Sequence, residues 1–484
     1  MKKITSLSDD ALIALDNLGD STSSLLEPRL RFGVTGLSRA GKTVFITSLI
    51  HNLLNGGRLP MFEAFSQGRI AEVALAPQPD DQIPRFRYEQ HLKDLLEEQK
   101  WPQSTSAISQ VRLKIKYESA SSWTRRFGAG ELTIDIVDYP GEWLLDLPLL
   151  GKTFEEWSAE AIALSKLPNR KTLAKSWHAA AAEISPNDAE DDVVAERLAG
   201  EFTQYLHSCR QDENALSTLP PGRFLMPGDL KGSPALTFAP LDIPSGQRAE
   251  KASLHSMMAR RFEAYKSLVV KPFFRDHFAR IDRQIVLVDA LQALNVGSSA
   301  LADLEHALRD ILECFNHGKK GWFSSLFSTR TDRILFAATK ADHLHQENHQ
   351  RLEAILARLV ERASAAAHFS GAQTSALAMA AIRSTQEAEH VLAGEKLPVI
   401  IGTPQAGEII GNDRFDGNTR TAIFPGDLPE NVDDMFSGSG SKTDLNFVRF
   451  RPPHLERLST GRTPPLPHIR LDRALEFLFG DYLQ

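Results

Sequence analysis

Residues 36–43 read GLSRAGKT and follow the apolar run RLRFGVT at 29–35. The eight residues match the pattern GxxxxGK[ST] at every fixed position. Apolar residues at helical spacing continue in VFITSLIHNLL, up to a break at residues 55–57. The order is strand, glycine-rich loop and helix, in which loop N–H groups and the positive helix N-terminus can face a phosphate. A glycine turn into a helix without a ligand is the alternative, but the flanking elements favour a phosphate-binding loop.

The pattern assigns contacts to most of this loop. Lys42 is expected to reach the β- and γ-phosphates, where it would also act in catalysis, and the Thr43 hydroxyl to ligate Mg²⁺. Arg39 is an alternative source of positive charge in cis, although a side chain at this place usually points outward. The other expected nucleotide-binding residues of the stretch are Gly36, Ser38, Arg39, Ala40, Gly41 and Val44.

Further apolar runs have the length and composition of strands, and helical segments separate most of them. These runs are residues 110–119, 131–139, 284–290, 332–340 and 376–382. The alternation predicts an α/β fold, a P-loop domain with a mostly parallel central sheet covered by helices on both faces. QVRLKIKYES at 110–119 alternates apolar and basic residues, so we expect an edge strand there.

Changes in composition divide the chain into three parts. A long stretch rich in Ala, Leu, Glu and Lys interrupts the strands, and short strand candidates between Gly, Pro and Asp fill the C-terminal part. We predict a nucleotide-binding domain from residues 1–144 and 284–390, with an N-terminal helical arm at 1–28. We also predict a helical insertion at 145–283 and a C-terminal β-rich appendage with a closing helix at 391–484.

Charge and cysteine content exclude several classes of protein. The formal net charge of -7 gives no general reason to expect a nucleic-acid partner. Cys209 and Cys314 have no metal-type spacing, and a reducing cytoplasmic setting follows from so few cysteines. We find no signal peptide, because acidic residues interrupt the N-terminal apolar run, and no apolar segment long enough to cross a membrane.

Two strands end in an aspartate that could stand near the metal. LTIDIVD runs into Asp138-Tyr139-Pro140-Gly141, a DxxG arrangement, whereas QIVLVD ends in Asp289 without a following glycine. In DxxG the aspartate lies near Mg²⁺ and the glycine N–H can bond the γ-phosphate. We therefore assign Asp138 to the metal and expect Asp289 to be a polar strand end or a helix N-cap.

A candidate site for the base follows another strand. RILFAATKAD ends in Thr339-Lys340-Ala341-Asp342, which is close to the guanine-reading pattern NKxD. The Asp342 carboxylate can accept two hydrogen bonds from guanine N1 and N2, and the Lys340 stem can lie along the ring. Adenine lacks this donor pair, so the carboxylate would be left unpaired. A capped strand-to-helix turn is the alternative.

GLSRAGKT, DYPG and TKAD, in this order and each at a strand end, resemble the motifs of the Ras-like branch of P-loop GTPases. The longer context RFGVTGLSRAGKTVFITSLIHNLL with DIVDYPGEWLLDLPLL resembles the YcjX family, bacterial P-loop proteins associated with stress responses. The likeness extends over most of the chain. It implies a Ras-like core that binds GTP or GDP with Mg²⁺, with family-specific additions and no settled cellular task.

The resemblance assigns further residues. A threonine from the first switch would ligate Mg²⁺, and we choose Thr105 over Ser104 in WPQST at 101–105. A backbone N–H to the guanine oxygen would come from Arg383 or Ser384, although the usual Ser-Ala pair is absent there.

The catalytic positions of the second switch would be Gly141 and Glu142. Ras has glutamine where this chain has Glu142, so we expect slow intrinsic hydrolysis.

These assignments favour a magnesium-dependent GTPase that acts as a switch. An unidentified protein effector would contact the switch loops and the helical insertion. An ATPase motor or chaperone-like enzyme is an alternative, but it would need Asp289 with a catalytic glutamate, and Ala290 follows instead. A nucleotide-stabilised scaffold is another.

Two basic loops have open roles. The stretch 317–327 mixes basic and aromatic residues and would suit a peripheral membrane or partner contact, or packing onto the insertion. Arg125 and Arg126 lie in the other loop, for which a solvated turn is the simplest account.

Overall fold

The computed structural model describes residues 28–37, 39–78, 80–103, 105, 107–120, 130–212, 219–242, 250–313, 331–369, 371–392, 395–436, 445–455 and 463–484. Several sequence-based expectations fall outside these residues. They are the N-terminal arm up to residue 27, Ser38, Ser104, Arg125, Arg126, Cys314 and the 317–327 stretch.

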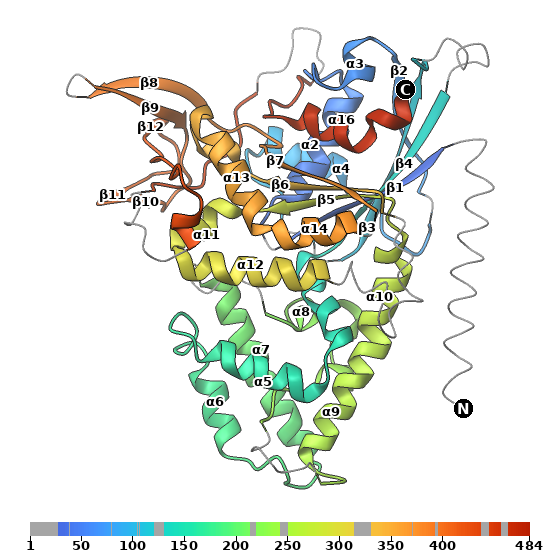
Figure 1. Cartoon of the computed structure of the whole chain (residues 1–484), viewed down its shortest axis with the longest axis vertical. Helices are drawn as coiled ribbons and strands as arrows, with labels where there is room; N and C mark the ends of the chain where they lie inside the picture. The colour runs from blue at the N-terminus through green and yellow to red at the C-terminus, as the bar shows by residue number, and fades with distance from the viewer. Residues whose placement is uncertain are drawn as a thin grey trace.

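A seven-stranded sheet forms the centre of the fold, in the order β2-β3-β4-β1-β5-β6-β7 (Figure 1). Its strands are β1 (Arg29–Gly36), β2 (Ile70–Ala76), β3 (Ser109–Tyr117), β4 (Gly130–Asp138), β5 (Arg283–Val288), β6 (Arg333–Ala338) and β7 (Gln373–Ala378). The pairs β4–β1, β1–β5, β5–β6 and β6–β7 are parallel. The pairs β2–β3 and β3–β4 are antiparallel. The predicted α/β class with a mostly parallel sheet is confirmed.

The expected edge position of 110–119 is wrong. This run forms β3, which pairs with β4 on one side and with β2 on the other. Its basic residues belong to the more exposed face of the sheet, where they pair with acidic residues of neighbouring strands, as Lys114 does with Glu131 and Lys116 with Glu72. The alternation therefore reflects one buried and one solvated face and says nothing about the edge.

Helices cover both faces of the sheet. Apolar residues of α2 (Lys42–Leu54) and α16 (Leu471–Phe479) share one buried cluster with β1, β3 and β4. On the opposite face pack α11 (Ala290–Val296), α12 (Ser298–Glu313), α13 (His349–Leu359) and α14 (Glu361–Phe369). The short helices α3 (Glu63–Ser66) and α4 (Tyr88–Leu96) also belong to this part, whereas α15 (Asp433–Phe436) belongs to the C-terminal part.

Helices also fill the stretch in which we predict an insertion, and they extend away from the sheet (Figure 1). They are α5 (Phe154–Ser165), α6 (Lys175–Ala182), α7 (Asp192–Gln211), α8 (Gly222–Leu225), α9 (Leu254–Tyr265) and α10 (Lys271–Asp276). Trp157 and Phe202 of these helices share one buried cluster with Val286 and Phe336 of the sheet. The insertion is thus packed onto the sheet, while its exact limits stay a prediction. Among the described residues, no helix combines the length and apolar character of a membrane span.

The C-terminal part contains a three-stranded antiparallel sheet of β8 (Gln386–Leu392), β9 (Glu395–Gly402) and β12 (Thr421–Ile423). A two-residue pair, β10 (Ile409–Ile410) and β11 (Asp413–Arg414), lies beside it. The closing helix α16, grouped above with the appendage, packs instead on the central sheet, where the rings of Phe479 and Phe32 lie 5.1 Å apart.

Candidate functional site

The five parallel strands end at one edge of the sheet, and a cavity opens there. The parallel pairing places the loops after β1, β4, β5, β6 and β7 together, the usual binding edge of an α/β sheet. The cavity holds about 240 Å³, whereas roughly 10–15 Å³ is enough for one water. Of the sequence-predicted site residues, Arg39, Ala40, Gly41, Lys42, Thr43, Val44, Thr105, Glu142, Thr339, Lys340, Asp342 and Ser384 line it.

The loop after β1 depends on its two glycines. Gly41 has a φ of 86° and caps α2, a conformation that costs a glycine little. At Gly36 a side chain would lie 2.6 Å from the Leu287 carbonyl oxygen. Lys42 follows as the first residue of α2, and its Nζ donates to the Gly36 carbonyl at 3.0 Å. The ammonium is therefore held over the loop, inside the cavity, while Arg39 is exposed.

The three predicted metal ligands lie together. The hydroxyl oxygens of Thr43 and Thr105 are 3.2 Å apart, and the Thr105 hydroxyl donates to Asp138 Oδ2 at 2.7 Å. Asp138 is 2% exposed, and no described residue forms a hydrogen bond with its Oδ1. A buried carboxylate oxygen without a partner is costly, so this atom has capacity for a ligand.

Burial also sets the charges here. It raises the pKa of Asp138 to about 6, and the Lys42 ammonium and the Thr105 hydrogen bond limit that rise. Burial lowers the pKa of Lys42, against the attraction of Asp138 and Glu142. Two hydroxyls and one carboxylate form the all-oxygen ligand set that Mg²⁺ prefers, and its charge would favour the ionised form of Asp138. The residues therefore fit a magnesium ion.

The base-reading motif stands at the other end of the cavity. Asp342 is buried, and its Oδ2 accepts hydrogen bonds from the Ser384 N–H at 2.7 Å and from the Ser384 hydroxyl at 2.6 Å. Lys340 adopts a left-handed conformation with φ 61°, and its ammonium pairs with Asp289 Oδ2. Asp289 also caps α11 by accepting from the Gln292 N–H, so its expected role as an N-cap is confirmed.

Of two other predicted residues, Thr339 lines the cavity and also binds a neighbouring strand, and Arg383 lies outside the cavity. The Thr339 hydroxyl donates to the Val288 carbonyl at 3.4 Å and so ties β6 to β5. Arg383 is not among the described residues that line the cavity. Its backbone N–H donates to the Pro467 carbonyl at 2.7 Å, and its side chain pairs with Glu387. Ser384, rather than Arg383, is the residue of this loop that the structure brings to Asp342.

The DxxG glycine packs against the phosphate loop. A side-chain carbon at Gly141 would lie 2.0 Å from the Gly36 carbonyl oxygen and 2.8 Å from Lys42 Nζ, so only glycine fits. The next residue, Glu142, is 3% exposed. Its Oε1 lies 2.8 Å from Arg210 Nη2 of α7, an ion pair that places a positive charge beside the expected catalytic position.

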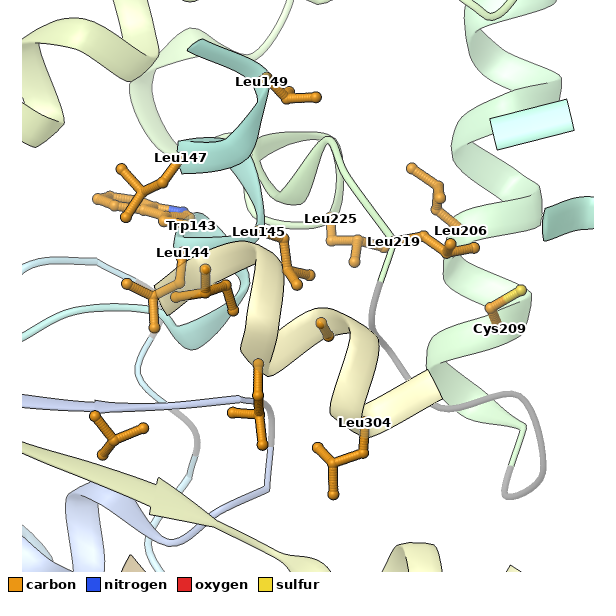
Figure 2. Packing of buried hydrophobic residues seen from close by; sticks show 14 of the residues in the cluster. Trp143, Leu144, Leu145, Leu147, Leu149, Leu206, Cys209, Leu219, Leu225 and Leu304 are labelled. Atoms are coloured by element: carbon orange, nitrogen blue, oxygen red, sulfur yellow. The ribbon is translucent and has the colours of Figure 1, made fainter. Parts of the chain in front are cut away.

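The segment after Gly141 joins the nucleotide motifs to the insertion. Residues Gly141–Gly151 form a 3-10 helix whose leucines and Trp143 share one buried cluster with Leu206 and Cys209 of α7 and Leu304 of α12 (Figure 2). Arg223 of α8 stacks over Trp143, with the guanidinium carbon 3.1 Å from the ring centre. The insertion thus contacts the motif directly through α7 and α8.

Asp146 anchors the same segment. Its carboxylate accepts from the Gly222 N–H at 2.7 Å, the Arg223 N–H at 3.2 Å and the Tyr265 hydroxyl at 2.6 Å. Burial raises the pKa of Asp146 to about 6, although these hydrogen bonds oppose the rise. A side-chain carbon at Gly222 would lie 1.7 Å from the Glu142 carbonyl oxygen.

Substituting Gly222 by alanine should destabilise the packing of α8 against the 3-10 segment, and with it the folded protein. The Glu142 carbonyl is backbone, so the new methyl group must displace the 3-10 segment, and overpacking of this kind costs about 1–3 kcal/mol. Gly200→Ala is the matched control. Apart from the backbone of its own helix, no atom lies within 4 Å of its Cβ position, and alanine in the exposed face of α7 should stabilise by up to about 1 kcal/mol. Thermal unfolding of both variants checks the expectation, and equal midpoints would contradict it.

Several cavity residues carry no sequence motif. These are Phe45, Trp101, Pro102, Leu287, His343, Met379, Ala380, Ala381, Ile382, Gln405, Arg449 and Phe450. Trp101 and Pro102 adjoin the Thr105 segment, and His343 adjoins Asp342, so their proximity to known motifs was a usable signal. Gln405, Arg449 and Phe450 come from the C-terminal part, and Arg210 comes from α7; only the tertiary fold brings these four to the site.

Comparison with known proteins gives matches over nearly the full chain. The model of a family described as "YcjX-like family, DUF463" matches residues 30–483. A protein of Escherichia coli (strain K12) named "Ras-like GTPase YcjX" is 37% identical over 470 residues, which cover 95% of this chain and 97% of that protein. A Shewanella oneidensis protein of the same name is 33% identical over 497 residues of alignment, covering 98% and 99%.

Proposed function

Because this chain belongs to the YcjX-like family, we propose that it is a magnesium-dependent GTP-binding protein that hydrolyses GTP slowly and acts as a nucleotide-dependent switch. One observation carries the proposal. A single cavity at the carboxyl edge of the sheet contains a phosphate loop with Lys42, the Thr43 and Thr105 hydroxyls, and the buried Asp342. Two relatives bear the name "Ras-like GTPase", which agrees with this chemistry.

Phosphate binding would use the loop and the start of α2. Gly41 turns the backbone into the helix, so N–H groups and the positive helix end face the cavity. Lys42 adds an ammonium that now donates to the Gly36 carbonyl and could turn to the phosphate oxygens. Thr43, Thr105 and Asp138 would hold Mg²⁺, which when bound neutralises phosphate charge.

Hydrolysis should be slow because Glu142, the residue after the DxxG glycine, forms an ion pair with Arg210. Glu142 is buried and pairs with Arg210, so its carboxylate is held towards α7. A carboxylate in this pair is poorly placed to orient a water that attacks the γ-phosphate. The Arg210 charge reduces repulsion between Glu142 and the phosphates, which favours binding more than cleavage.

The same contacts offer a route to an effector. Gly141 lies against the phosphate loop, Glu142 pairs with α7, and Asp146 binds the start of α8. A change at the γ-phosphate that moves Gly141 would therefore move groups bonded to the insertion. We propose that the insertion and the two switch segments present this change to a protein partner. A stress-response role, implied by the resemblance, stays a prediction.

The alternative of an ATPase with Asp289 at the metal receives little support. Asp289 pairs with Lys340 and caps α11, whereas Asp138 lies beside Thr43 and Thr105.

Calorimetric titration of the full chain with nucleotides tests the proposal. GDP and a non-hydrolysable GTP analogue should bind, and ATP should bind at least 100-fold more weakly. Removal of Mg²⁺ should weaken the binding of the GTP analogue. A single-turnover assay with radiolabelled GTP should give slow phosphate release. Equal affinity for ATP, or no binding of either guanine nucleotide, would refute the guanine assignment.

A further inference from the structure

The C-terminal part contributes a wall to the cavity that no nucleotide motif accounts for. This appendage wall consists of Gln405, Arg449 and Phe450, which line the same cavity as Lys42 and Asp342. Gln405 follows the strand β9. Arg449 and Phe450 follow Val448, which belongs to the buried cluster of the appendage. The wall therefore comes from a unit that is distinct from the sheet bearing the motifs.

Phe450 fixes the appendage wall at the base end. The residue is 1% exposed and shares a small buried cluster with Ile400, Ile423 and Val448 of the appendage. Its ring also meets the ring of His343 edge to face, with centroids 5.1 Å apart. His343 directly follows Asp342, so the core of the appendage is packed against the residue beside the predicted guanine contact.

The backbone of Phe450 fixes the wall to the first switch segment as well. Its carbonyl accepts a hydrogen bond from Trp101 Nε1 at 2.7 Å and another from Gln405 Nε2 at 3.2 Å. Trp101 begins the segment that ends at Thr105, the residue hydrogen-bonded to Asp138. Just before this segment, Gln99 also contacts the C-terminal part of the chain, with its Nε2 2.9 Å from His454 Nδ1.

These contacts join the appendage wall to residues beside both the base motif and the metal ligands. Phe450 touches the base end through His343 and the metal end through Trp101. A nucleotide that spans Lys42 and Asp342 would put its ribose between them, in the cavity that Gln405 and Arg449 also line. Arg449 is held by Glu408, whose carboxylate accepts from the Arg449 Nε at 2.6 Å and from its N–H at 2.8 Å. Polar groups held in this way suit hydroxyl and carbonyl oxygens of a nucleoside.

We propose that the appendage wall is a nucleoside-binding subsite, which contacts the ribose side of a guanine nucleotide and, through Trp101, holds the first switch segment closed over it. The inference rests on the proposed function and gives the C-terminal appendage a task within it. Release of the nucleotide then requires the Trp101–Phe450 contact to open.

Dissociation of tritiated GDP from the full-length protein, chased with excess unlabelled GDP, tests the inference. Trp101→Phe keeps an aromatic ring but removes the N–H donor, and Gln405→Leu keeps the volume but removes the amide. Each should accelerate dissociation about three- to tenfold, as expected for the loss of one hydrogen bond. Inorganic pyrophosphate, which has no nucleoside, should compete equally well against wild type and Gln405→Leu.

Arg451→Ala is the matched control. Arg451 neighbours Phe450, but its side chain donates to the Gly417 carbonyl at 3.0 Å and to Asn418 at 3.1 Å within the appendage. Its dissociation rate should stay within twofold of wild type. Unchanged rates in both Trp101→Phe and Gln405→Leu, or equal acceleration in Arg451→Ala, would overturn the subsite. A wild-type protein that binds no GDP would instead refute the proposed function, and the subsite with it.

Discussion

Replacing Asp342 by asparagine should turn the preference of the protein from guanine to xanthine nucleotides. In the wild type the carboxylate can accept from N1–H and the N2 amino group of guanine while its Oδ2 stays bonded to Ser384. Asparagine turns one of these two bonds into a contact between donors and removes the charge from the other, and two charge-assisted bonds at about 1.5–3 kcal/mol each correspond to at least a 100-fold drop in affinity for GTP.

The geometry around Asp342 also determines how the new side chain turns. The Ser384 N–H can only donate, so it should retain the asparagine oxygen at the Oδ2 position. The side-chain NH2 of the asparagine then points to the base. Xanthine carries a carbonyl oxygen where guanine carries its amino group, so xanthine can accept a hydrogen bond from the asparagine side chain. With guanine, two donors would face each other at this position.

Competition of GTP, XTP and ATP against tritiated GDP or XDP measures the change. Asp289→Asn is the control, since Asp289 also ends a neighbouring strand but pairs with Lys340 and caps α11. It should retain the preference for GTP. If Asp342→Asn still preferred GTP, Asp342 would not be the residue that reads the base.

The central fold could be predicted from the sequence because its strands are short apolar runs between helical segments. Each run proposed at 30–35, 110–119, 131–139, 284–290, 332–340 and 376–382 overlaps a strand of the sheet, although the last run shares only residues 376–378 with β7. The strand β2 (Ile70–Ala76) was missed, and with it the true edge, since IAEVALA shows neither a long apolar run nor clear alternation. Strand order depends on packing that local pattern does not encode.

The phosphate and base motifs could be located in the sequence because each is a local stretch whose chemistry needs fixed spacing. Thr105 was assigned from the resemblance, which calls for a threonine in the loop before a strand, and the structure brings its hydroxyl to Asp138. Arg210 and Phe450 belong to no such stretch. The Trp101–Phe450 hydrogen bond joins residues 349 positions apart, and such pairs become neighbours only once the insertion and the appendage have packed.

Replacing Lys42 by methionine should abolish measurable nucleotide binding. Methionine preserves most of the buried aliphatic volume, so the change chiefly removes the ammonium that donates to the Gly36 carbonyl and lies inside the cavity. Charge-assisted bonds to two phosphates contribute about 3–6 kcal/mol, which corresponds to at least a 100-fold loss of affinity. Calorimetric titration with GDP and a GTP analogue measures the loss, and Lys171→Met, at an exposed turn of the insertion, should bind like wild type.

The ligand-free protein gives the control for folding of the Lys42 variant. Burial disfavours the charged form of Lys42, so losing that charge removes a cost as well as its attraction to Asp138. The unfolding midpoint without nucleotide should therefore change little, while stabilisation by added GDP should vanish, because only bound ligand shifts the folding equilibrium. A variant that still gained stability from GDP would mean that the cavity holds the phosphates without Lys42. Binding would then rest on the loop N–H groups and the magnesium ligands, and the lysine would serve chiefly to brace the Gly36 carbonyl.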